Sequence, residues 1–497
     1  MASKEEQIYQ QRLTKLQRLR ARGIDPYPPR YHRTHTNSDA VSAFGAWESQ
    51  QDGHSPLVKV AGRVTALRRM GKAAFLDLRD GSGRLQVSAR LDRLGEQGFE
   101  TLRDVDLGDI LGAEGPLFRT RTGEVTVDAG HLTMLSKALQ TPPEKWHGLT
   151  DVEQRYRQRY RDLIANAEVR ELFLMRSQVV ASIRRFLDRR GFIEVETPIL
   201  TEHWGGAAAR PFITHHNELD RDLYMRVATE LYLKRLIVGG YDKVYEIGRI
   251  FRNEGVGFKW NPEFTMLESY EAYADYNDVM AMLEEMVAHA AVEAAGSVKV
   301  RWEHADTVEE MDFTPPWRRL TMRQALIDYA GIDPEEHREI EGLQIRMKEM
   351  GLEPEKGAGR GKLLDQIVSA YVEPKLIQPT FLLDYPVELS PLAKRKPDNA
   401  AYVERFEPFA GGFEFGNAYT ELNDPLEQRE RFELQARLRA AGDEEAELID
   451  EDFLNALEHG MPPTGGLGVG IDRLVMLLSG KRSIREVILF PTLRERK

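Results

Sequence analysis

Hydrophobic and polar residues alternate in short runs between residues 58 and 135, and they follow a helical period over long stretches of the remaining chain. The alternating runs are VKVAGRVTAL, AAFLDLRD, GRLQVSAR, DILGAEGPLF and EVTVDA, and the turns between them hold Gly-Lys, Asp-Gly-Ser-Gly and Thr-Gly. Short alternating runs separated by glycine-containing turns are typical of a small all-β barrel. We therefore predict such a barrel in the N-terminal part of the chain.

The predicted barrel suggests a nucleic-acid-binding domain. An OB-fold is the leading candidate, and barrels of this kind bind single-stranded nucleic acid with exposed aromatic and basic side chains. Arg68, Phe75 and Gln86 are candidates for such contacts, because a ring can stack on a base while an amide reads its edge. The alternation itself favours another interpretation of Phe75, in which the ring belongs to the barrel core.

A basic amphipathic helix is predicted before the barrel. Ser3 and Glu6 have the spacing of a capping box, and Gly23 ends the helical pattern. The basic residues between them could hold an RNA backbone, or they could form a solvated face over a small apolar seam. We favour RNA binding because a candidate nucleic-acid-binding barrel follows.

Two strand-like runs flank a charged loop between residues 244 and 270, VYEIGRIFRNEGVGFKWNPEFTMLESY. The first run is apolar and β-branched and ends at Arg252, and the loop holds Asn, Gly and Pro. In the second run a period of two places Phe264, Met266, Glu268 and Tyr270 on one face. The pattern predicts a hairpin that presents an aromatic ring, acceptors and an arginine to one cleft.

The stretch ERFEPFAGGFEFGNAYTELNDP predicts a second hairpin, in which Gly411 and Gly412 form the turn and bring Glu407 near Glu414. Two close carboxylates repel each other unless a cation lies between them, and magnesium prefers oxygen ligands. A salt-bridged hairpin is the alternative. Strict alternation would place Glu414 on the face opposite the polar residues that follow it, unless a bulge intervenes.

Composition limits the class of protein. At 497 residues the chain is too long for one typical core. It has no run of about eighteen apolar residues and no apolar leader, so we expect a cytoplasmic protein without membrane spans. The absence of cysteine excludes disulfides. The formal net charge of -12 argues against general adhesion to nucleic acid, so any RNA contact must use local basic patches.

Several stretches together resemble the class II aminoacyl-tRNA synthetases, and among them the lysyl-tRNA synthetase family. FRNEGVGFKWNPEF resembles motif 2, VRELFLMRSQVVASIRRFLDRRGFIEVETPIL resembles motif 1, and GGLGVGIDRLV resembles motif 3. RRMGKAAFLDLRDGSGRLQV resembles the anticodon-binding barrel of the lysyl family. The class I signatures HIGH and KMSKS do not occur in the sequence.

The resemblance implies an α+β fold, with the antiparallel sheet and flanking helices of class II synthetases joined to an N-terminal all-β OB-fold barrel. We expect the N-terminal helix and anticodon-binding domain at 1–145, a linker helix at 146–165, and a catalytic domain at 166–497 with a helical insertion near 296–365. Motif 1 is the class II dimerisation element, so the resemblance also implies a homodimer.

The resemblance further implies the residues of each site. For ATP it implies Arg252, Glu254, Asn261, Phe264 and Arg473, of which Arg252 and Arg473 are also the catalytic residues. For L-lysine it implies Gly206, Glu230, Glu268, Tyr270, Asn417, Tyr419 and Glu421. For Mg²⁺ it implies Glu407 and Glu414, and for the anticodon of tRNA(Lys) it implies Arg68, Phe75, Gln86 and Glu124.

Two observations qualify this assignment. Glu230 could instead be a surface acid, paired with Lys234 four residues later on a helix. The chain also departs from the family pattern, because Trp260 stands where the family usually has histidine and residues 202–204, Glu-His-Trp, replace a short apolar stretch. Trp260 changes the part of the loop that is expected to contact tRNA or phosphate, and it leaves the matched core residues intact.

The implied activity is ATP-dependent formation of lysyl-adenylate, followed by transfer of lysine to the 3′ end of tRNA(Lys). An aspartate–tRNA or asparagine–tRNA ligase of the same subclass is one alternative, but buried carboxylates such as Glu268 and Glu421 would demand a cationic substrate. A synthetase-like protein lysyltransferase or RNA-binding protein is another alternative. Relatives of that kind usually lack an intact barrel, whereas this sequence keeps it.

Overall fold

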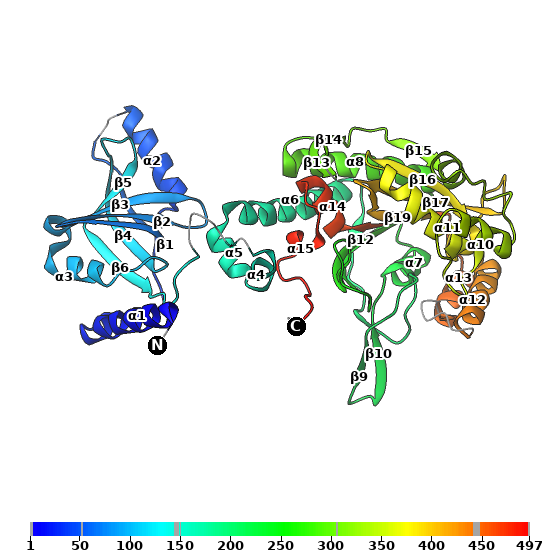
Figure 1. The fold of residues 1–497 in the computed structure, drawn as a ribbon, viewed down its shortest axis with the longest axis horizontal. Helices are drawn as coiled ribbons and strands as arrows, with labels where there is room; N and C mark the ends of the chain where they lie inside the picture. Colours follow the sequence, from blue (N-terminus) through cyan, green and yellow to red (C-terminus); the bar gives the residue numbers. More distant parts are fainter. Residues whose placement is uncertain are drawn as a thin grey trace. The chain divides into compact units, whose positions relative to one another are not determined.

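The computed structural model describes residues 3–50, 53–143, 149, 151–304, 307–440 and 448–495. The chain divides into two compact units, Met1–Thr150 and Asp151–Lys497, each of which has its own hydrophobic core (Figure 1). The predicted combination of an all-β N-terminal unit with a larger α+β unit is confirmed.

The N-terminal unit is a β-barrel. Its strands follow the order β1-β2-β3-β5-β4-β6, and a further pairing of β1 with β4 closes the barrel. The strands are β1 (Leu57–Met70), β2 (Ala73–Arg79), β3 (Arg84–Arg90), β4 (Ile110–Arg119), β5 (Val125–Ala129) and β6 (His131–Ser136). The helices of the unit are α1 (Lys4–Ala21), α2 (Asn37–Gln50) and α3 (Leu91–Arg103).

Alternation along β2 decides which side chains fill the barrel. Ala74, Leu76 and Leu78 are buried in its core, because every second residue of a strand points to the same face. Phe75 points to the other face and is only half-buried. The interpretation of Phe75 as a core residue is therefore wrong, because its neighbours occupy the inward positions.

The basic residues of α1 attach this helix to the barrel. Arg12 is buried and donates hydrogen bonds to the carbonyl oxygens of Leu107 and Ala138. The other pairs join Lys15 to Asp106, and Arg18 and Arg22 to Asp104. The expectation that these cations bind RNA is not supported by this packing, because acidic side chains and carbonyls of the same unit already bind them.

The larger unit is built on a mostly antiparallel sheet with the strand order β15-β16-β17-β19-β20-β12-β11-β7, and β18 pairs with β17. Its strands are β7 (Ile193–Glu194), β11 (Lys243–Phe251), β12 (Glu263–Ala272), β15 (Arg318–Thr321), β16 (Thr380–Pro386), β17 (Tyr402–Ala410), β18 (Phe413–Glu414), β19 (Gly416–Thr420) and β20 (Thr464–Gly470). The predicted hairpin from Val244 to Tyr270 is confirmed as β11 and β12.

Helices cover one face of this sheet. α6 (Ala167–Arg189), α8 (Tyr276–Ala295) and α14 (Ile471–Ser479) contribute apolar residues to a core that also holds Leu467 and Val469 of β20. Other helices of this unit are α4 (Val152–Arg157), α5 (Arg159–Ala165), α7 (Glu230–Val238), α12 (Pro425–Ala440), α13 (Glu451–Glu458) and α15 (Ile484–Val487). Residues on the other face of β20 are therefore free to line a site.

Residues 296–365 hold both strands and helices. They begin with a two-stranded hairpin of β13 (Lys299–His304) and β14 (Thr307–Asp312). After β15 they continue through α9 (Met322–Ala325), a π-helical turn (Leu326–Ala330) and α10 (Ile340–Glu349) into α11 (Arg360–Ile367). A separate cluster of buried apolar residues, among them Leu343, Leu363 and Leu364, packs these helices together.

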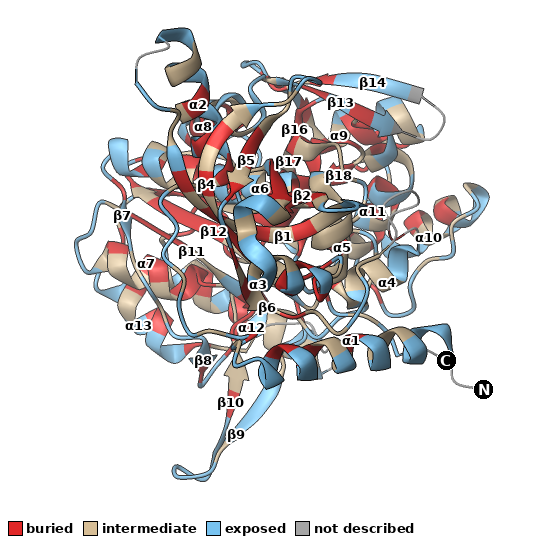
Figure 2. Ribbon diagram, turned by 90° about the vertical axis from the view of Figure 1, so that its left-hand side faces the viewer, coloured by how far each residue is buried: buried red, intermediate tan, exposed pale blue. Residues whose placement is uncertain are grey.

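A small sheet of β8 (Leu200–Thr201), β10 (Arg221–Met225) and β9 (Ile213–His216) projects from the larger unit. β9 is almost entirely exposed, in contrast to the buried strands of the main sheet (Figure 2). The short helical turns are Val368–Val372, Glu373–Lys375 and Val387–Leu389. Across the described residues, no helix is both long enough and apolar enough to cross a membrane.

A buried ion pair next to the sheet gives a test of the fold. Glu246 of β11 lies 2.5 Å from Arg226 and also accepts hydrogen bonds from Thr197. Replacing Glu246 with alanine should lower the free energy of unfolding by about 3–5 kcal/mol, because Arg226 would remain charged and buried without its partner. Denaturant titration would measure the loss.

The matched control for this prediction is Glu310→Ala, which breaks an exposed pair with Lys299. Exposed pairs contribute about 0–1 kcal/mol. A loss in Glu246→Ala no larger than the loss in this control would contradict the importance of the buried pair.

Candidate active site

Glycines of β20 form the floor of a trench in the sheet. β20 lies between β12 and β19, and Gly466 and Gly468 face the trench. Each glycine has larger residues beside it on the neighbouring strands: Tyr270 and Tyr419 beside Gly466, and Glu268 and Asn417 beside Gly468. The absence of side chains on the middle strand leaves open space between the two polar walls.

Gly466 is required by close packing. A Cβ atom at this position would lie 1.9 Å from Oε1 of Glu421 and 2.7 Å from Cε1 of Tyr270. The carboxylate of Glu421 therefore lies directly over the glycine, in space that any other residue would fill. Because of this contact, the glycine-rich strand β20 and the carboxylate of Glu421 are parts of one site.

Three carboxylates and one ammonium group lie buried at this place. Glu230, Glu268 and Glu421 are each at most 5% exposed. Lys234 is fully buried, and its Nζ lies 2.5 Å from Oε1 of Glu230 and forms an ion pair with Oε2 of Glu421. The interpretation of Glu230 as a surface acid is wrong, although its predicted i,i+4 pair with Lys234 does form.

Burial shifts the titration of these groups. Burial, together with the charge of Glu230, raises the pKa of Glu268 to about 7, although the backbone N–H of Thr229 donates a 3.0 Å hydrogen bond that stabilises the anion. Burial likewise raises the pKa of Glu421, against the opposing effect of Lys234. The Oε1 atom of Glu421 accepts no hydrogen bond from any described residue. The site therefore has unsatisfied demand for a cationic donor.

Gly206 packs against Glu230, the first residue of α7. Gly206 has a positive φ of 85°, and a Cβ atom there would lie 3.0 Å from Cβ of Glu230 and 3.1 Å from Cβ of Ala228. The two residues that the resemblance implies for L-lysine therefore lie side by side here.

Arg252 and Phe264 lie together where the motif 2 loop leaves the sheet. The guanidinium carbon of Arg252 is 5.3 Å from the ring centre of Phe264, and its Nε donates to the carbonyl oxygen of Val227. Burial lowers the pKa of Arg252, and the negative charges of Glu254 and Glu414 oppose that shift. Arg252 forms no ion pair with any residue that the structure describes, so its guanidinium group can bind an anionic ligand.

Asn261 and Glu254 take different positions in the same loop. Asn261 is buried, and its amide donates to the carbonyl oxygen of Glu263 and accepts from the backbone N–H of Thr492 at 3.1 Å. Its side chain thus ties the end of the loop to the C-terminal segment. Glu254 is exposed at the start of the loop and interacts electrostatically with Arg252.

Glu407 and Glu414 lie on the two strands of the second predicted hairpin. Their strands pair with Phe409 opposite Glu414, which places Glu407 and Glu414 on one face. Glu407 accepts from Arg405 at 2.6 Å and from Tyr385 at 2.7 Å. Burial raises the pKa of Glu407 to about 8; Arg405 opposes this shift and the charge of Glu414 adds to it.

A break in the strand brings Glu414 and Asn417 into one site. β18 ends at Glu414 and β19 begins at Gly416, so strict alternation does not continue across Phe415. Arg405 then joins the two halves, because it binds Glu407 through Nη2 and donates from Nε to Oδ1 of Asn417 at 3.0 Å. Arg473 binds the other side, with Nη1 3.1 Å from Oε2 of Glu414.

Sequence reasoning missed Arg405 and Tyr385, and it treated Lys234 only as a surface partner. Arg405 lies in the same quoted run as Glu407, two residues earlier, so strand periodicity could have found it. Tyr385 lies on β16 and its hydroxyl reaches Glu407 only because β16 pairs with β17. The apolar positions around Lys234 in LYLKRLIV were the available signal that this lysine is buried.

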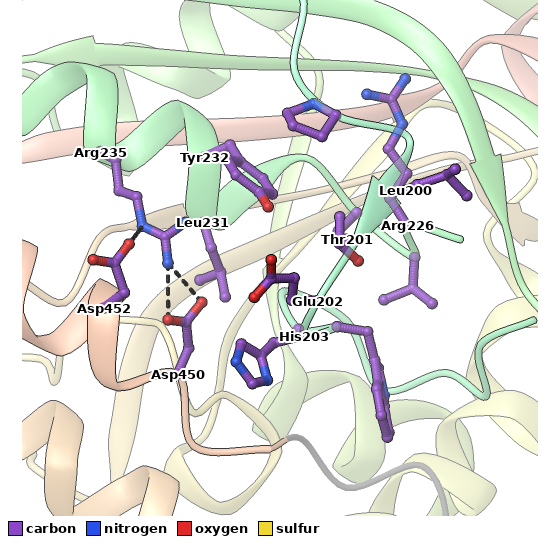
Figure 3. A pocket seen from close by; sticks show the side chains of 15 residues that line it. Leu200, Thr201, Glu202, His203, Arg226, Leu231, Tyr232, Arg235, Asp450 and Asp452 are labelled. Carbon is purple, nitrogen blue, oxygen red and sulfur yellow. Dashed lines mark hydrogen bonds and ion pairs between the residues drawn. The ribbon is translucent and has the colours of Figure 1, made fainter. Parts of the chain in front are cut away.

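The unusual residues 202–204 line a separate pocket of about 440 Å³. Figure 3 shows Glu202 and His203 facing this pocket, with Arg235 paired to Asp450 and Asp452 at its other side. None of the predicted site residues lines it. Trp260, the other departure, lies with its ring 2.5 Å from the position a Cβ atom of Gly257 would take, so it packs over a tight turn within the loop.

On the barrel, the four predicted anticodon residues share one outer face. Arg68 pairs with Phe75 across β1 and β2, while Gln86 of β3 pairs with Asp77. Gln86 accepts a 3.0 Å hydrogen bond from Thr126. Glu124 is held by Arg84, which also pairs with Asp77. The face combines a half-buried ring with fixed polar groups.

Comparisons with known proteins match both units. The family model described as tRNA synthetases class II (D, K and N) matches residues 151–494, and the model described as OB-fold nucleic acid binding domain matches residues 58–135. The chain is 56% identical to the lysine–tRNA ligase of Dehalococcoides mccartyi over 99% of this chain and 98% of that protein.

Two further relatives extend over similar lengths. The lysine–tRNA ligase of Moorella thermoacetica is 54% identical over 98% of this chain and 97% of its own. The lysine–tRNA ligase of Chloroflexus aurantiacus is 53% identical over 98% of both chains.

The raised pKa of Glu268 predicts a pH-dependent cost to stability. Its pKa is about 7 in the folded protein and about 4.3 in an unfolded chain, so the stability present at low pH is lost as the pH rises towards and through 7. Glu268→Gln removes that loss and keeps an acceptor for the N–H of Thr229. The substitution changes the free energy of unfolding, and we expect this change to be about 2–3 kcal/mol more favourable at pH 8 than at pH 5. Denaturant titration at both pH values measures it.

Glu310→Gln provides the control, because Glu310 is exposed on β14. An equal effect of Glu268→Gln at both pH values would show that Glu268 does not bind a proton in the folded protein.

Proposed function

The chain belongs to the family of class II tRNA synthetases (D, K and N), and we propose that within this family it joins L-lysine to tRNA(Lys) with consumption of ATP. The observation that carries the proposal is the charge of the trench. When all three are ionised, Glu230, Glu268 and Glu421 carry three negative charges, against two positive charges on Lys234 and Arg252. An amino acid of net charge +1 completes this balance.

The pocket distinguishes lysine from the other substrates of the family. Aspartate would add negative charge beside buried carboxylates, and asparagine would leave them without a cation. L-lysine brings two ammonium groups and one carboxylate. Its ε-ammonium group is the donor that Oε1 of Glu421 lacks.

We place the substrate with its ends at opposite walls of the trench. The α-ammonium group binds Glu230 beside the backbone of Gly206, and the carboxylate binds Arg252. The ε-ammonium group lies among Glu421, Glu268 and Tyr270. Asn417 and Tyr419, which hydrogen-bond to each other, form the remaining wall.

ATP binds along the motif 2 loop and motif 3. Phe264 stacks on the adenine ring, and Arg252 and Arg473 bind its phosphates. Glu254 orients the base, whereas Asn261 acts through the loop, because its amide already bonds to Glu263 and Thr492. The guanidinium group of Arg252 forms no ion pair with a described residue, and this supports its contact with the α-phosphate.

Glu407 and Glu414 fit a magnesium site. Both offer carboxylate oxygens, and the charge of Glu414 adds to the burial that raises the pKa of Glu407. The described residues contain no group of three or more histidine or acidic side chains placed to hold a metal. The pair would therefore hold Mg²⁺ together with ATP phosphates, and the ion would supply positive charge to the triphosphate.

Positioning and charge then account for the chemistry. A carboxylate oxygen of lysine attacks the α-phosphorus of ATP, the bond to the bridging oxygen breaks, and pyrophosphate leaves. A ribose hydroxyl at the 3′ end of tRNA next attacks the carbonyl carbon, and AMP leaves. Arg252 aligns the carboxylate with the α-phosphate, and Arg473 neutralises charge on the departing phosphates.

The outer face of the barrel binds the anticodon of tRNA(Lys). Phe75 stacks on a base, and Gln86 and Glu124 read base edges from positions fixed by Thr126 and Arg84. Arg68 lies opposite Phe75 and is exposed, so it can contact the backbone. These substrates place the protein in the cytoplasm.

A homodimer forms through motif 1. β7 is the last strand of the main sheet, and its Ile193 is 48% exposed. Leu174 of α6, Ile199 and Leu200 are also exposed and belong to the same motif 1 run. Exposed apolar side chains along motif 1 favour contact with a second copy.

The proposed activity predicts amino-acid-dependent ATP–pyrophosphate exchange without tRNA. Among the twenty amino acids, L-lysine should support exchange at least about a thousandfold better than aspartate or asparagine, because a pocket with buried polar groups rejects ligands that leave them unpaired. Radiolabelled pyrophosphate incorporation measures this directly. Exchange with aspartate would overturn the pocket assignment, and exchange with none would overturn the activity.

The packing over Gly466 predicts a selective defect. Gly466→Ala should raise the KM for lysine by about tenfold or more, equivalent to about 1.4 kcal/mol, because the new methyl group displaces Glu421. The KM for ATP should stay within about twofold and serves as the internal control. An unchanged KM for lysine would show that Glu421 does not hold the substrate.

A further inference from the structure

Lys234 is a buried cation that the proposed reaction does not itself require. Its side chain is 0% exposed, and its Nζ lies between Glu230 of α7 and Glu421, which follows β19. The rings of Tyr270 and Phe453 lie 6.0 and 5.9 Å from it. A lysine enclosed by aromatic rings and bound by two carboxylates is a fixed part of the pocket.

The two carboxylates that Lys234 joins have different tasks in the proposed site. Glu230 lies against Gly206 at the α-amino end of the substrate, and Glu421 lies over Gly466 at the ε-amino end. The ammonium group of Lys234 therefore contacts both carboxylates that are proposed to bind the two ends of the substrate. Each acceptor keeps a second oxygen for the substrate, and Oε1 of Glu421 has no hydrogen-bond partner among the described residues.

Without an internal cation the pocket would hold three carboxylates in a dry environment. Burial already raises the pKa of Glu421, and Lys234 opposes that shift, so removal of Lys234 would favour the protonated form of Glu421 further. A protonated Glu421 is a poor acceptor for an ammonium ion. The titratable groups that face this cluster are Glu230 and Lys234 from α7, Glu268 and the neutral Tyr270 from β12, the neutral Tyr419 and Glu421 from β19 and its end, and Arg252 from the motif 2 loop.

We propose that Lys234 is a specificity-determining positioning residue, whose ammonium group pairs with both Glu230 and Glu421 and holds the two carboxylates in place for the two ammonium groups of the substrate. This inference rests on the proposed lysine activation. It assigns to Lys234 the role of an internal counter-ion, without contact to the reacting atoms. The pair of acids then discriminates for an amino acid with a cation at each end.

The decisive variant is Lys234→Met, which keeps the shape of the side chain and removes its charge. We expect the KM for lysine in pyrophosphate exchange to rise at least tenfold, while the KM for ATP stays within about twofold. Infrared spectra of the ligand-free variant at pH 7.5 should show an additional C=O band of a protonated carboxylic acid, beyond the band that Glu268, Glu407 and Glu421 give in the wild-type protein. Damage to packing alone would not produce that band.

Lys137→Met is the matched control. Lys137 is also fully buried and paired with two carboxylates, Asp106 and Asp109, but it lies in the N-terminal unit. Its replacement should lower stability without changing the KM for lysine. An unchanged KM for lysine in folded Lys234→Met, or a rise in both KM values without the infrared band, would overturn the role of Lys234.

A second variant covers the case in which Lys234→Met does not fold. Lys234→Ala leaves a space the size of the lost side chain, and n-butylammonium should restore folding and lysine activation, whereas 1-butanol should not. Equal rescue by both compounds, or rescue by neither, would overturn the requirement for charge. Absence of lysine-dependent exchange in the wild-type protein would instead refute the proposed function.

Discussion

Burial of carboxylates is the constraint on which the larger unit depends. A carboxylate removed from water costs several kcal/mol unless a cation or hydrogen bonds compensate it. Glu230, Glu268 and Glu421 are compensated only in part, by Lys234 and by the backbone N–H of Thr229. Among the described residues, Oε1 of Glu421 has no hydrogen-bond donor. The proposed specificity for a cationic amino acid rests on this incomplete compensation.

The same strand builds the core and the floor of the site. Leu467 and Val469 of β20 point into the main hydrophobic cluster beneath α6, α8 and α14. Gly466 and Gly468 point the other way, where Glu421 and the walls of the trench need the space. Because a strand alternates strictly, the apolar residues that anchor β20 also fix the glycines in register with β12 and β19.

Strict alternation along a strand also decides which side chains of the barrel point inwards. Ala74, Leu76 and Leu78 fill its core, and Phe75 is thereby forced outwards beside Arg68.

Arginines at fixed positions also organise both units. Arg405 joins Glu407 to Asn417 in the larger unit, and Arg84 joins Asp77 to Glu124 in the barrel. In each unit a bidentate cation sets the spacing of polar groups that a strand alone would leave independent.

The sequence by itself determined the barrel, the hairpin from Val244 to Tyr270, the α+β class and the family. These features depend on local periodicity, turn residues and short motifs, which are readable within a few residues. Tertiary structure alone decided that Lys234 reaches Glu421, that Tyr385 reaches Glu407, that the amide of Asn261 is bound within the chain, and that Phe75 points outwards. Periodicity tells which residues share a face, but the partner that covers the face comes from a distant segment and is chosen by packing.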